Sequence, residues 1–257
     1  IRDAKELIKK NRGIDVEFDK DMADPKVYKL WQDGDSVGIF QFESQGMTNF
    51  MKELKPDCLE DIIAGVSLYR PGPMDQIPRY IANKKDPEHA VYTHPALKPI
   101  LKVTYGCMVY QEQVMQIVRD LAGYSLGRAD LVRRAMGKKK LDVMAKEREN
   151  FVHGKLDENG NVEIPGCVRN GIDETSANKI FDEMSEFAKY AFNKSHAACY
   201  AVVAYQTAYL KAYYPAEFMA AMLNSFLGNL DKIPIYINEC KKSNIAILKP
   251  DINKSNR

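Results

Sequence analysis

The chain has 257 residues, of which 45% are apolar and 28% are charged, and its formal net charge at pH 7 is +2. This composition can form one large hydrophobic core or two smaller ones, and it excludes disordered, collagen-like and disulfide-stabilised classes. The longest stretch without a charge inside a helical pattern, Ala197 to Leu210, is shorter than the about 20 residues that span a bilayer. Five cysteines without a CxxC pair are typical of buried thiols in a reducing compartment, so we expect a soluble cytoplasmic protein.

Apolar residues recur at helical spacing along most of the chain, which predicts a mainly α fold. Ser44, Asp173 and Pro215 are typical of helix starts. Because the pattern is already helical at Ile1, we expect the chain to be part of a longer protein. Helices are predicted at 1–10, 25–33, 44–54, 57–66, 73–84, 111–122, 127–136, 140–153, 173–188, 195–213, 215–227 and 231–243.

Signals for β-structure are few and short. Residues 37–42 alternate between apolar and polar character, and residues 107–110 follow a turn, so both are predicted as strands. A β-hairpin is predicted within 155–168, because Asn159 and Gly160 form the dipeptide that most favours a tight hairpin turn.

Basic residues are concentrated in one segment. Between Arg119 and Lys140 there are seven cations and two anions, an excess larger than that of the whole chain. Such a segment forms either a solvated basic face or a site for the phosphates of a nucleotide or nucleic acid. The residues alone leave both interpretations open.

The end of this segment has the spacing of a phosphate clamp. Arg134 and Lys138 lie four residues apart, so they point the same way if the helix continues to Lys138. Leu131 and Met136 are the predicted core anchors of this helix. Gly137 can interrupt the helix and allow the backbone to approach a phosphate.

A second cluster, Lys189 to His196, mixes aromatic, amide and basic side chains just before the uncharged helix. The N-terminus of that helix is expected to offer backbone N–H groups to an anion. Further along, Tyr205, Tyr209 and Tyr213 form a stripe. The stripe either packs in the core with its hydroxyl groups bonded, or stacks against bases.

Common catalytic motifs are absent: the sequence has no GxxxxGK[ST], GxGxxG, HExxH or GxSxG. The four histidines do not have the spacing of metal ligands. Two DxD triplets, Asp19–Asp21 and Asp33–Asp35, lie in predicted turns and not on strands. We therefore predict no catalytic residue and no metal site in this chain.

Several long motifs resemble those of the bacterial DNA polymerase III α subunit, a C-family replicative DNA polymerase. They are VGIFQFESQGM (37–47), LYRPGPM (68–74), YGCMVYQEQVMQI (105–117), AGYSLGRADLVRRAMGKKK (122–140), FAKYAFNKSHAACYAVVAYQTAYLKAYYPAEFMAAML (187–223) and LKPDIN (248–253). The FNKSHAA and RRAMGKKK forms are similar to the shorter, DnaE-type subunit and not to the PolC type.

This resemblance implies a helical fingers domain, with a few short strands and one hairpin insertion, that follows a palm domain. Residues 1–13 would continue a helix from the palm, and residues 14–228 would form the fingers with the insertion near 155–170. Residues 229–257 would end the fingers and lead toward C-terminal domains. The metal-binding aspartates of the palm, and with them Mg²⁺, would lie outside this chain.

The resemblance also implies binding of the incoming dNTP during template-directed DNA synthesis. The candidates for the triphosphate are Arg133, Arg134, Lys138 and Lys139; those near the nascent base pair or the phosphates are Asn193, Lys194 and His196. Arg70 either joins them or fixes its Pro-Gly loop to a neighbouring carboxylate.

The implied partners are primer–template DNA and dNTP, with other replicase subunits and the sliding clamp bound through other regions, and no membrane. An isolated chain without the palm is expected to be inactive. The alternatives are a non-catalytic helical module that binds nucleic acid and a helical scaffold with an incidental basic face.

Overall fold

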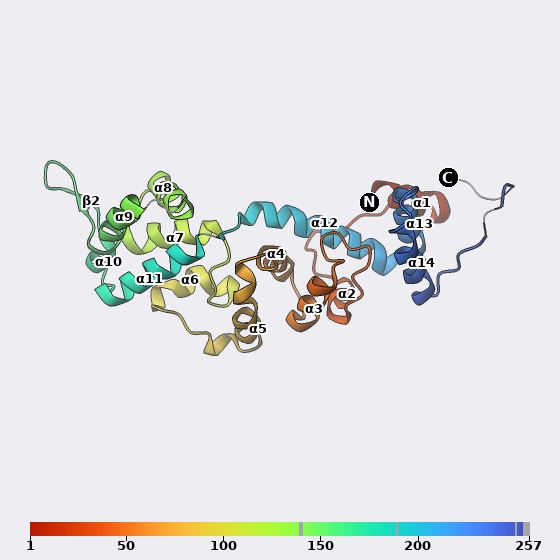
Figure 1. Ribbon diagram of the computed structural model, residues 1–257, viewed down its shortest axis with the longest axis horizontal. Helices are drawn as coiled ribbons and strands as arrows, with labels where there is room; N and C mark the ends of the chain where they lie inside the picture. The colour runs from red at the N-terminus through yellow and green to blue at the C-terminus, as the bar shows by residue number, and fades with distance from the viewer. Residues whose placement is uncertain (139–140, 189, 250, 254–257) are drawn as a thin grey trace. The chain divides into compact units, whose positions relative to one another are not determined.

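The computed structural model describes residues 1–138, 141–188, 190–249 and 251–253, apart from the side chain of Leu141. Within these residues the chain forms fourteen α-helices, four short 3₁₀-helices and one two-stranded antiparallel hairpin (Figure 1). The predicted mainly α fold with one hairpin is therefore confirmed. In this described part of the chain, no helix combines the length and the apolar character that crossing a membrane requires.

The chain divides into two compact units. Unit 1 comprises Ile1–Ile62 and Ala198–Arg257, and unit 2 comprises Ile63–Ala197. Two helices, α4 (Leu59–Leu68) and α12 (Lys194–Tyr213), carry the chain from one unit into the other. Each unit encloses a hydrophobic core of its own.

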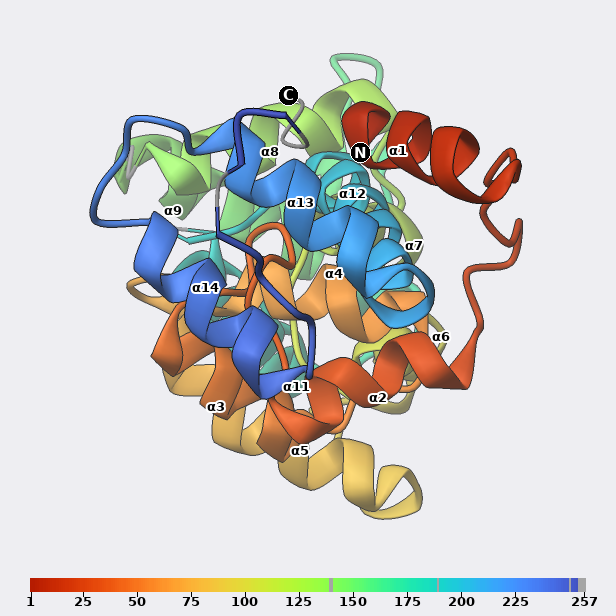
Figure 2. The same ribbon diagram turned by 90° about the vertical axis from the view of Figure 1, so that its right-hand side faces the viewer.

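Unit 1 is an assembly of helices from both ends of the chain. Its further elements are α1 (Arg2–Arg12), α2 (Pro25–Asp33), α3 (Gln45–Leu54), α13 (Pro215–Ser225) and α14 (Ile233–Lys242). Figure 2 shows α1 and α14 beside α13, and their core includes the buried Ile8, Phe218 and Tyr236. At the edge of this core, Arg12 Nε lies 2.8 Å from Glu217 Oε1 and ties α1 to α13.

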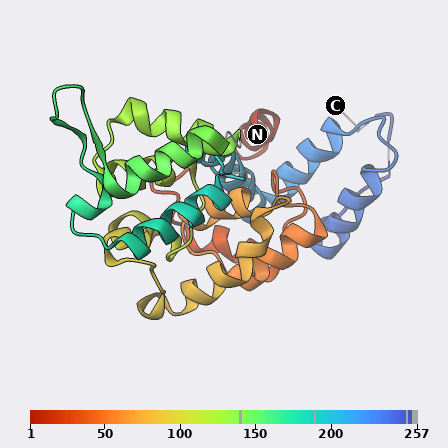
Figure 3. The ribbon, with the colours of Figure 1, turned by 60° about the vertical axis from the view of Figure 1, so that its left-hand side comes forward.

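Unit 2 contains the basic segment and both clusters of predicted site residues. Its elements are η1 (Pro73–Gln76), α5 (Ile77–Lys85), η2 (Pro87–His89), η3 (Pro95–Leu97), α6 (Lys98–Leu101), η4 (Lys102–Thr104), α7 (Gln111–Ala122), α8 (Leu126–Gly137), α9 (Leu141–His153), β1 (Lys155–Leu156), β2 (Val162–Ile164), α10 (Gly166–Arg169) and α11 (Glu174–Phe187). Helix α7 packs against α8 and α6, and α9 packs against α10 and α11 around the buried Ile117, Phe151 and Phe181. The loop of the β1–β2 hairpin projects away from these helices (Figure 3).

Side-chain caps and glycines set the helix ends. The side chains of Asp24, Ser44 and Asp173 each accept a backbone N–H from the first turn that follows, so the starts predicted at Ser44 and Asp173 are confirmed. Gly34 and Gly123, both with φ 76°, end α2 and α7 in the left-handed conformation that glycine adopts without strain. Both helices have the bounds that the sequence predicts.

The two strands predicted outside the hairpin are wrong. Residues 37–42 form turns, in which the buried Ile39 and Phe42 are three residues apart, a spacing that a strand does not produce. Their backbone groups bond within turns and to side chains, without a neighbouring strand among the described residues. Residues 107–110 contain only the isolated bridge that Tyr110 makes with the segment before α12.

Two helix predictions also need correction. The predicted helix 73–84 divides into η1 and α5, and the α-helix begins one residue before Pro78 because proline fits only the first turn. In α8, Met136 is buried as predicted, but Leu131 is 65% exposed. The buried face of α8 runs through Val132 and Met136, and Leu131 is turned about 100° away from it.

The tyrosine stripe on α12 is explained by packing in unit 1. The Tyr205 hydroxyl accepts the backbone N–H of Asp24 at 3.0 Å and donates to Asp19 Oδ2 at 2.9 Å. Tyr213 donates to Asp24 Oδ2 at 2.6 Å, and its ring centroid lies 4.8 Å from that of Tyr209. These contacts favour the core-packing interpretation over stacking against bases.

Candidate functional site

Two neighbouring arginines of α8 bind one carboxylate. Arg133 Nη2 and Nε lie 2.7 and 3.0 Å from Asp130 Oδ1, and Arg134 Nη2 lies 2.7 Å from Asp130 Oδ2. Spacings of three and four residues bring these side chains together on a helix. The hydrogen bond from Arg133 and the charges of both arginines hold the pKa of Asp130 below its usual value, against a smaller effect of burial. Asp130 is therefore ionised at neutral pH.

The two arginines differ in their surroundings. The side chain of Arg133 is 22% exposed and that of Arg134 is 62% exposed. Arg133 Nη1 also donates to Gln111 Oε1 at 3.1 Å, across from α8 to the start of α7. Arg133 is thus held by two helices, whereas Arg134 extends into solvent.

Gln111 connects the arginines to the chain segment before α12. Its Nε2 donates to the carbonyl oxygen of Ala191 at 3.0 Å, and its backbone N–H donates to that of Phe192 at 2.9 Å. Together with the bond from Arg133, these contacts join three segments of unit 2 that are far apart in the sequence. This connection is made almost entirely by one residue.

Arg70 holds the same segment from another side. Its Nη2 donates to the carbonyl oxygen of Tyr190 at 2.9 Å, its Nε donates to that of Ser67 at 2.9 Å, and its Cζ lies 4.0 Å from the Phe192 ring centroid. Burial lowers the pKa of Arg70. Among the residues that the structure describes, the loop is therefore fixed to backbone carbonyls and not to a carboxylate. Gly72, with φ 104°, allows this approach, since a Cβ there would lie 2.3 Å from the Tyr190 ring.

A carboxylate of the chain lies at the N-terminus of α12. Glu112 Oε1 accepts Asn193 Nδ2 at 2.7 Å, and Glu112 Oε2 accepts the backbone N–H of Lys194 at 3.0 Å. The backbone N–H of His196 donates to Asn193 Oδ1 at 2.8 Å. The prediction that these N–H groups are open to an external anion is wrong at Lys194 and His196, because Glu112 and Asn193 already accept them.

Basic and aromatic side chains alternate around this helix start. Lys194 Nζ lies 5.2 Å from the Tyr110 ring centroid, and the ring centroids of His196 and Phe192 are 5.4 Å apart. Asn193 and His196 are exposed, and Lys194 is half-buried. The three predicted residues therefore lie together at a partly open surface of unit 2.

Helix α8 ends at Gly137, one residue before Lys138, but Arg134 and Lys138 still lie on one side of it. Both line a hollow of about 400 Å³ between α8 and α9, together with Arg128, Leu131, Ala135, Val143 and Glu147. Gly137 is the last residue of α8, and Lys138 follows as the C-cap. Lys139, the remaining triphosphate candidate, lies outside the described residues.

These contacts define one site in unit 2, which we call the four-segment site. It comprises Arg70–Gly72, Tyr110–Glu112, Asp130–Lys138 and Tyr190–His196. The sequence predicted its basic members but missed Gln111, Glu112 and Asp130. For Asp130, a signal was present in its spacing of three and four residues from the arginines.

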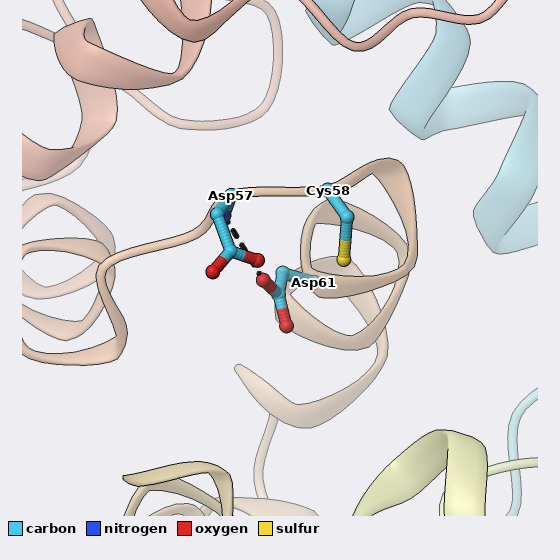
Figure 4. Close-up of side chains that lie close together, drawn as sticks. All are labelled: Asp57, Cys58 and Asp61. Atoms are coloured by element: carbon cyan, nitrogen blue, oxygen red, sulfur yellow. Dashed lines mark hydrogen bonds between the residues drawn. The ribbon is translucent and has the colours of Figure 1, made fainter.

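A cluster of potential metal ligands lies elsewhere, at the start of α4 in unit 1. Asp57, Cys58 and Asp61 each offer a ligand atom, and these atoms lie within 4.8 Å of one another (Figure 4). Asp61 Oδ2 accepts the backbone N–H of Asp57 at 3.1 Å, as in a helix cap. Burial, followed by the charge of Asp61, raises the pKa of Cys58 to about 11. Mg²⁺ takes oxygen ligands, so a protonated thiol beside a capping carboxylate does not fit it.

The DxD triplets have structural contacts. Asp19 Oδ2 accepts a backbone N–H of its own turn at 2.8 Å. Asp33 Oδ2 lies 2.8 Å from Lys29 Nζ, and Asp35 Oδ1 lies 2.7 Å from Lys211 Nζ. These are the contacts of turns and ion pairs.

Similarity to known proteins identifies the family of the chain that carries the four-segment site. A family model described as the bacterial DNA polymerase III alpha subunit finger domain matches residues 1–159. The chain belongs to this family. The resemblance that the motifs predicted is therefore confirmed.

Curated relatives extend the similarity over nearly the whole finger-domain chain. The DNA polymerase III subunit alpha of Thermus aquaticus is 47% identical over 99% of this chain and 20% of its own length. That of Rickettsia felis is 49% identical over 99% of this chain, and that of Xylella fastidiosa strain 9a5c is 51% identical over 91%. The chain spans about one fifth of the length of these relatives.

The family match covers three of the four segments. The matched residues 1–159 include the segments 70–72, 110–112 and 130–138. The fourth segment, Tyr190–His196, follows the matched region, but the Thermus aquaticus relative is similar over 99% of the finger-domain chain.

Proposed function

We propose that the four-segment site binds the triphosphate of an incoming dNTP and contacts the nascent base pair in template-directed DNA synthesis. The observation that carries the proposal is the meeting of four distant segments through Arg70, Gln111, Arg133 and Glu112. A solvated basic face needs no such connections. Membership of the polymerase finger-domain family supports the same conclusion.

Exposed and half-buried cations take different roles in this proposal. Arg134 and Lys138 are exposed and line the same hollow, so they can reach phosphate oxygens. A guanidinium and an ammonium both form strong, charge-assisted hydrogen bonds with phosphate. Arg133 and Arg70 are bound by acceptors of the protein, so they anchor the site. Lys139 is proposed as a further phosphate ligand.

The start of α12 is proposed to face the nascent base pair. His196 and Asn193 are exposed there and can donate hydrogen bonds. The aromatic ring of Phe192 lies beside the imidazole, with centroids 5.4 Å apart, and Lys194 adds positive charge. Such a combination suits a base together with its phosphate.

The chain contributes positioning and charge stabilisation, the main tasks of a protein in phosphoryl transfer. Mg²⁺, the cofactor expected for the whole polymerase, is assigned to residues outside this chain, and no step of the proposal uses a metal held by it. The isolated chain is therefore expected to extend no primer in Mg²⁺. Measurable templated incorporation by the pure chain would contradict this assignment. Primer–template DNA, other replicase subunits and the sliding clamp are proposed partners of the whole subunit.

The experiment that tests the proposal substitutes Arg134→Ala in a DNA polymerase III α subunit that carries this chain. Loss of a charge-assisted hydrogen bond of about 1.5–3 kcal/mol predicts a rise of roughly ten- to a hundredfold in the dNTP KM, or an equal loss in kcat/KM. Arg119→Ala is the matched control, since Arg119 is an exposed arginine of α7 that pairs with Asp120. Equal kinetics of the two variants would refute the role of Arg134.

The basic hollow between α8 and α9 also fits a second candidate, a non-catalytic module that binds nucleic acid. Its lining combines the apolar Leu131, Ala135 and Val143 with three cations and one carboxylate, namely Arg128, Arg134, Lys138 and Glu147. Titration distinguishes the two: a dNTP site requires the triphosphate, whereas a backbone-binding module depends steeply on salt and on DNA length. Binding of neither ligand at low salt would favour a helical scaffold.

A further inference from the structure

The carboxylate of Asp130 occupies guanidinium N–H groups of both Arg133 and Arg134. One of its oxygens binds Arg133 and the other binds Arg134. We propose that Asp130 is an internal competitor for Arg134: its carboxylate holds this arginine in the unliganded site and releases it to the triphosphate. Asp130 is thus a positioning residue, and the inference rests on the proposed dNTP site. The competition lowers the affinity of the site for every phosphate ligand and speeds the release of pyrophosphate.

The contacts indicate which arginine is released. Arg133 uses Nε and Nη2 on Asp130 and Nη1 on Gln111, and only 22% of its side chain is exposed. Arg134 contacts Asp130 through Nη2 across one helical turn, and 62% of its side chain is exposed. Exposed ion pairs of this kind are weak, because water solvates both charges. Arg134 can therefore turn to a phosphate while Arg133 keeps Asp130 in place.

The charge of Asp130 predicts how its removal changes the affinity for phosphate. A phosphate on Arg134 would lie near the ionised carboxylate that Arg133 keeps in place, and the two negative charges repel. Asn at position 130 removes this repulsion and keeps a carbonyl oxygen for Arg133. Loss of the carboxylate is therefore expected to tighten phosphate binding, whereas loss of a purely structural ion pair would weaken it or leave it unchanged.

The test measures binding of Mg·dATP and of pyrophosphate by calorimetry to a DNA polymerase III α subunit that carries this chain, unsubstituted and in four variants. Asp130→Asn is expected to tighten both dissociation constants by on the order of fivefold. Asp130→Glu keeps the carboxylate and is expected to restore the original affinity. Asp120→Asn is the charge-matched control, because Asp120 forms a comparable exposed pair with Arg119 at 2.7 Å on α7. Arg134→Ala reports whether binding uses the proposed site at all.

Kinetics of the whole polymerase subunit give a second readout. Asp130→Asn is expected to lower the dNTP KM, lower kcat where pyrophosphate release limits turnover, and strengthen inhibition by pyrophosphate. A helix that is merely destabilised cannot produce tighter binding of substrate and product together.

The outcomes separate the two proposals. If Arg134→Ala weakens binding and Asp130→Asn leaves it equal or weaker, the competitor role is wrong and the dNTP site stands. Tighter binding in Asp120→Asn to the same extent would also overturn it, since net charge alone would then explain the effect. If the unsubstituted subunit binds neither ligand, the dNTP site and the competitor role are both wrong.

Discussion

Lys211 and Glu239 meet inside unit 1, where Lys211 Nζ lies 2.8 Å from Glu239 Oε1 and neither side chain is more than 4% exposed. The same ammonium group donates to Asp35 Oδ1 at 2.7 Å and to the carbonyl oxygen of Val37 at 2.9 Å. Burial and the neighbouring Asp35 raise the pKa of Glu239. The lysine thus joins α12, α14 and the loop after α2 through charged groups that are shielded from solvent. Removing one of these groups would leave the others buried without a partner of opposite charge.

Lys211→Met is expected to destabilise unit 1 strongly, because it leaves two carboxylates near each other without their cation. Breaking a buried pair by removing one partner costs about 3–5 kcal/mol. Lys242→Met is the control, since Lys242 is 68% exposed and its Nζ lies 3.8 Å from the same Asp35. Urea unfolding measures both variants. Equal free energies of unfolding would show that the buried contacts of Lys211 contribute nothing specific.

Acid is expected to weaken the contact between α1 and α13. The hydrogen bond from Arg12, opposed in part by burial, holds the pKa of Glu217 below its ordinary value of 4.5. A carboxyl with a lowered pKa stabilises the fold above the unfolded-state value, and this contribution is lost as the pH falls through the folded-state value. Unsubstituted protein should therefore exceed Glu217→Gln in stability by a constant amount near neutral pH. The difference should shrink below about pH 4.5.

The control for this prediction is Glu6→Gln. Glu6 is an exposed residue of α1 whose carboxylate lies 3.9 Å from Arg2. Its stability difference from the unsubstituted protein should be small at every pH, as for other exposed pairs. Free energies of unfolding measured from pH 3 to pH 7 provide the comparison. A Glu217→Gln difference that persists unchanged at the lowest pH would contradict the linkage.

Local patterns predicted the helices and the hairpin, because their signals lie within a few residues. Caps such as Asp173 and the turn at Asn159 are examples. The family motifs named Arg134 and Lys194 as candidates for the proposed site. The strand predicted at 37–42 failed for the same reason, since alternation alone does not supply a partner strand.

Contacts between distant segments could not be predicted in this way. Nothing local to Glu112 indicates that it caps a helix 82 residues further on, and nothing local to Gln111 indicates that it binds Ala191. As a result, Arg133 and Arg134 are equivalent phosphate-binding candidates when only the sequence is considered. The structure distinguishes them through Gln111, which binds only the first.

Gly72→Ala is expected to disturb the anchor of the Arg70 loop. Gly72 has φ 104°, and an added Cβ would lie 2.3 Å from the Tyr190 ring, so backbone strain and overlap combine. Such substitutions cost about 1–3 kcal/mol. Gly127→Ala in the first turn of α8 is the control, because a Cβ there meets nothing within 4 Å and alanine loses less backbone entropy than glycine in a helix. Thermal unfolding should therefore shift in opposite directions for the two variants, and a shared direction would argue against this explanation.

Gln111→Ala is expected to separate Arg133 from the segment before α12. It removes the acceptor of Arg133 Nη1 and the donor to the Ala191 carbonyl, while the backbone bond to Phe192 remains. The substitution removes two hydrogen bonds of about 0.5–1.5 kcal/mol each. The dNTP kcat/KM of the polymerase subunit should therefore fall, which corresponds to a rise of about 1–3 kcal/mol in activation free energy. Gln116→Ala, at a half-buried glutamine further along α7, should leave it unchanged.

A double-mutant cycle decides whether Gln111 acts through Arg133. If it does, Gln111→Ala should have little further effect once Arg133→Ala is present, and the coupling energy should reach about 0.5–3 kcal/mol. If the two effects are additive, Gln111 influences nucleotide binding through Ala191 alone. Arg133 would then be isolated from the start of α12, and the four segments would not act as one site.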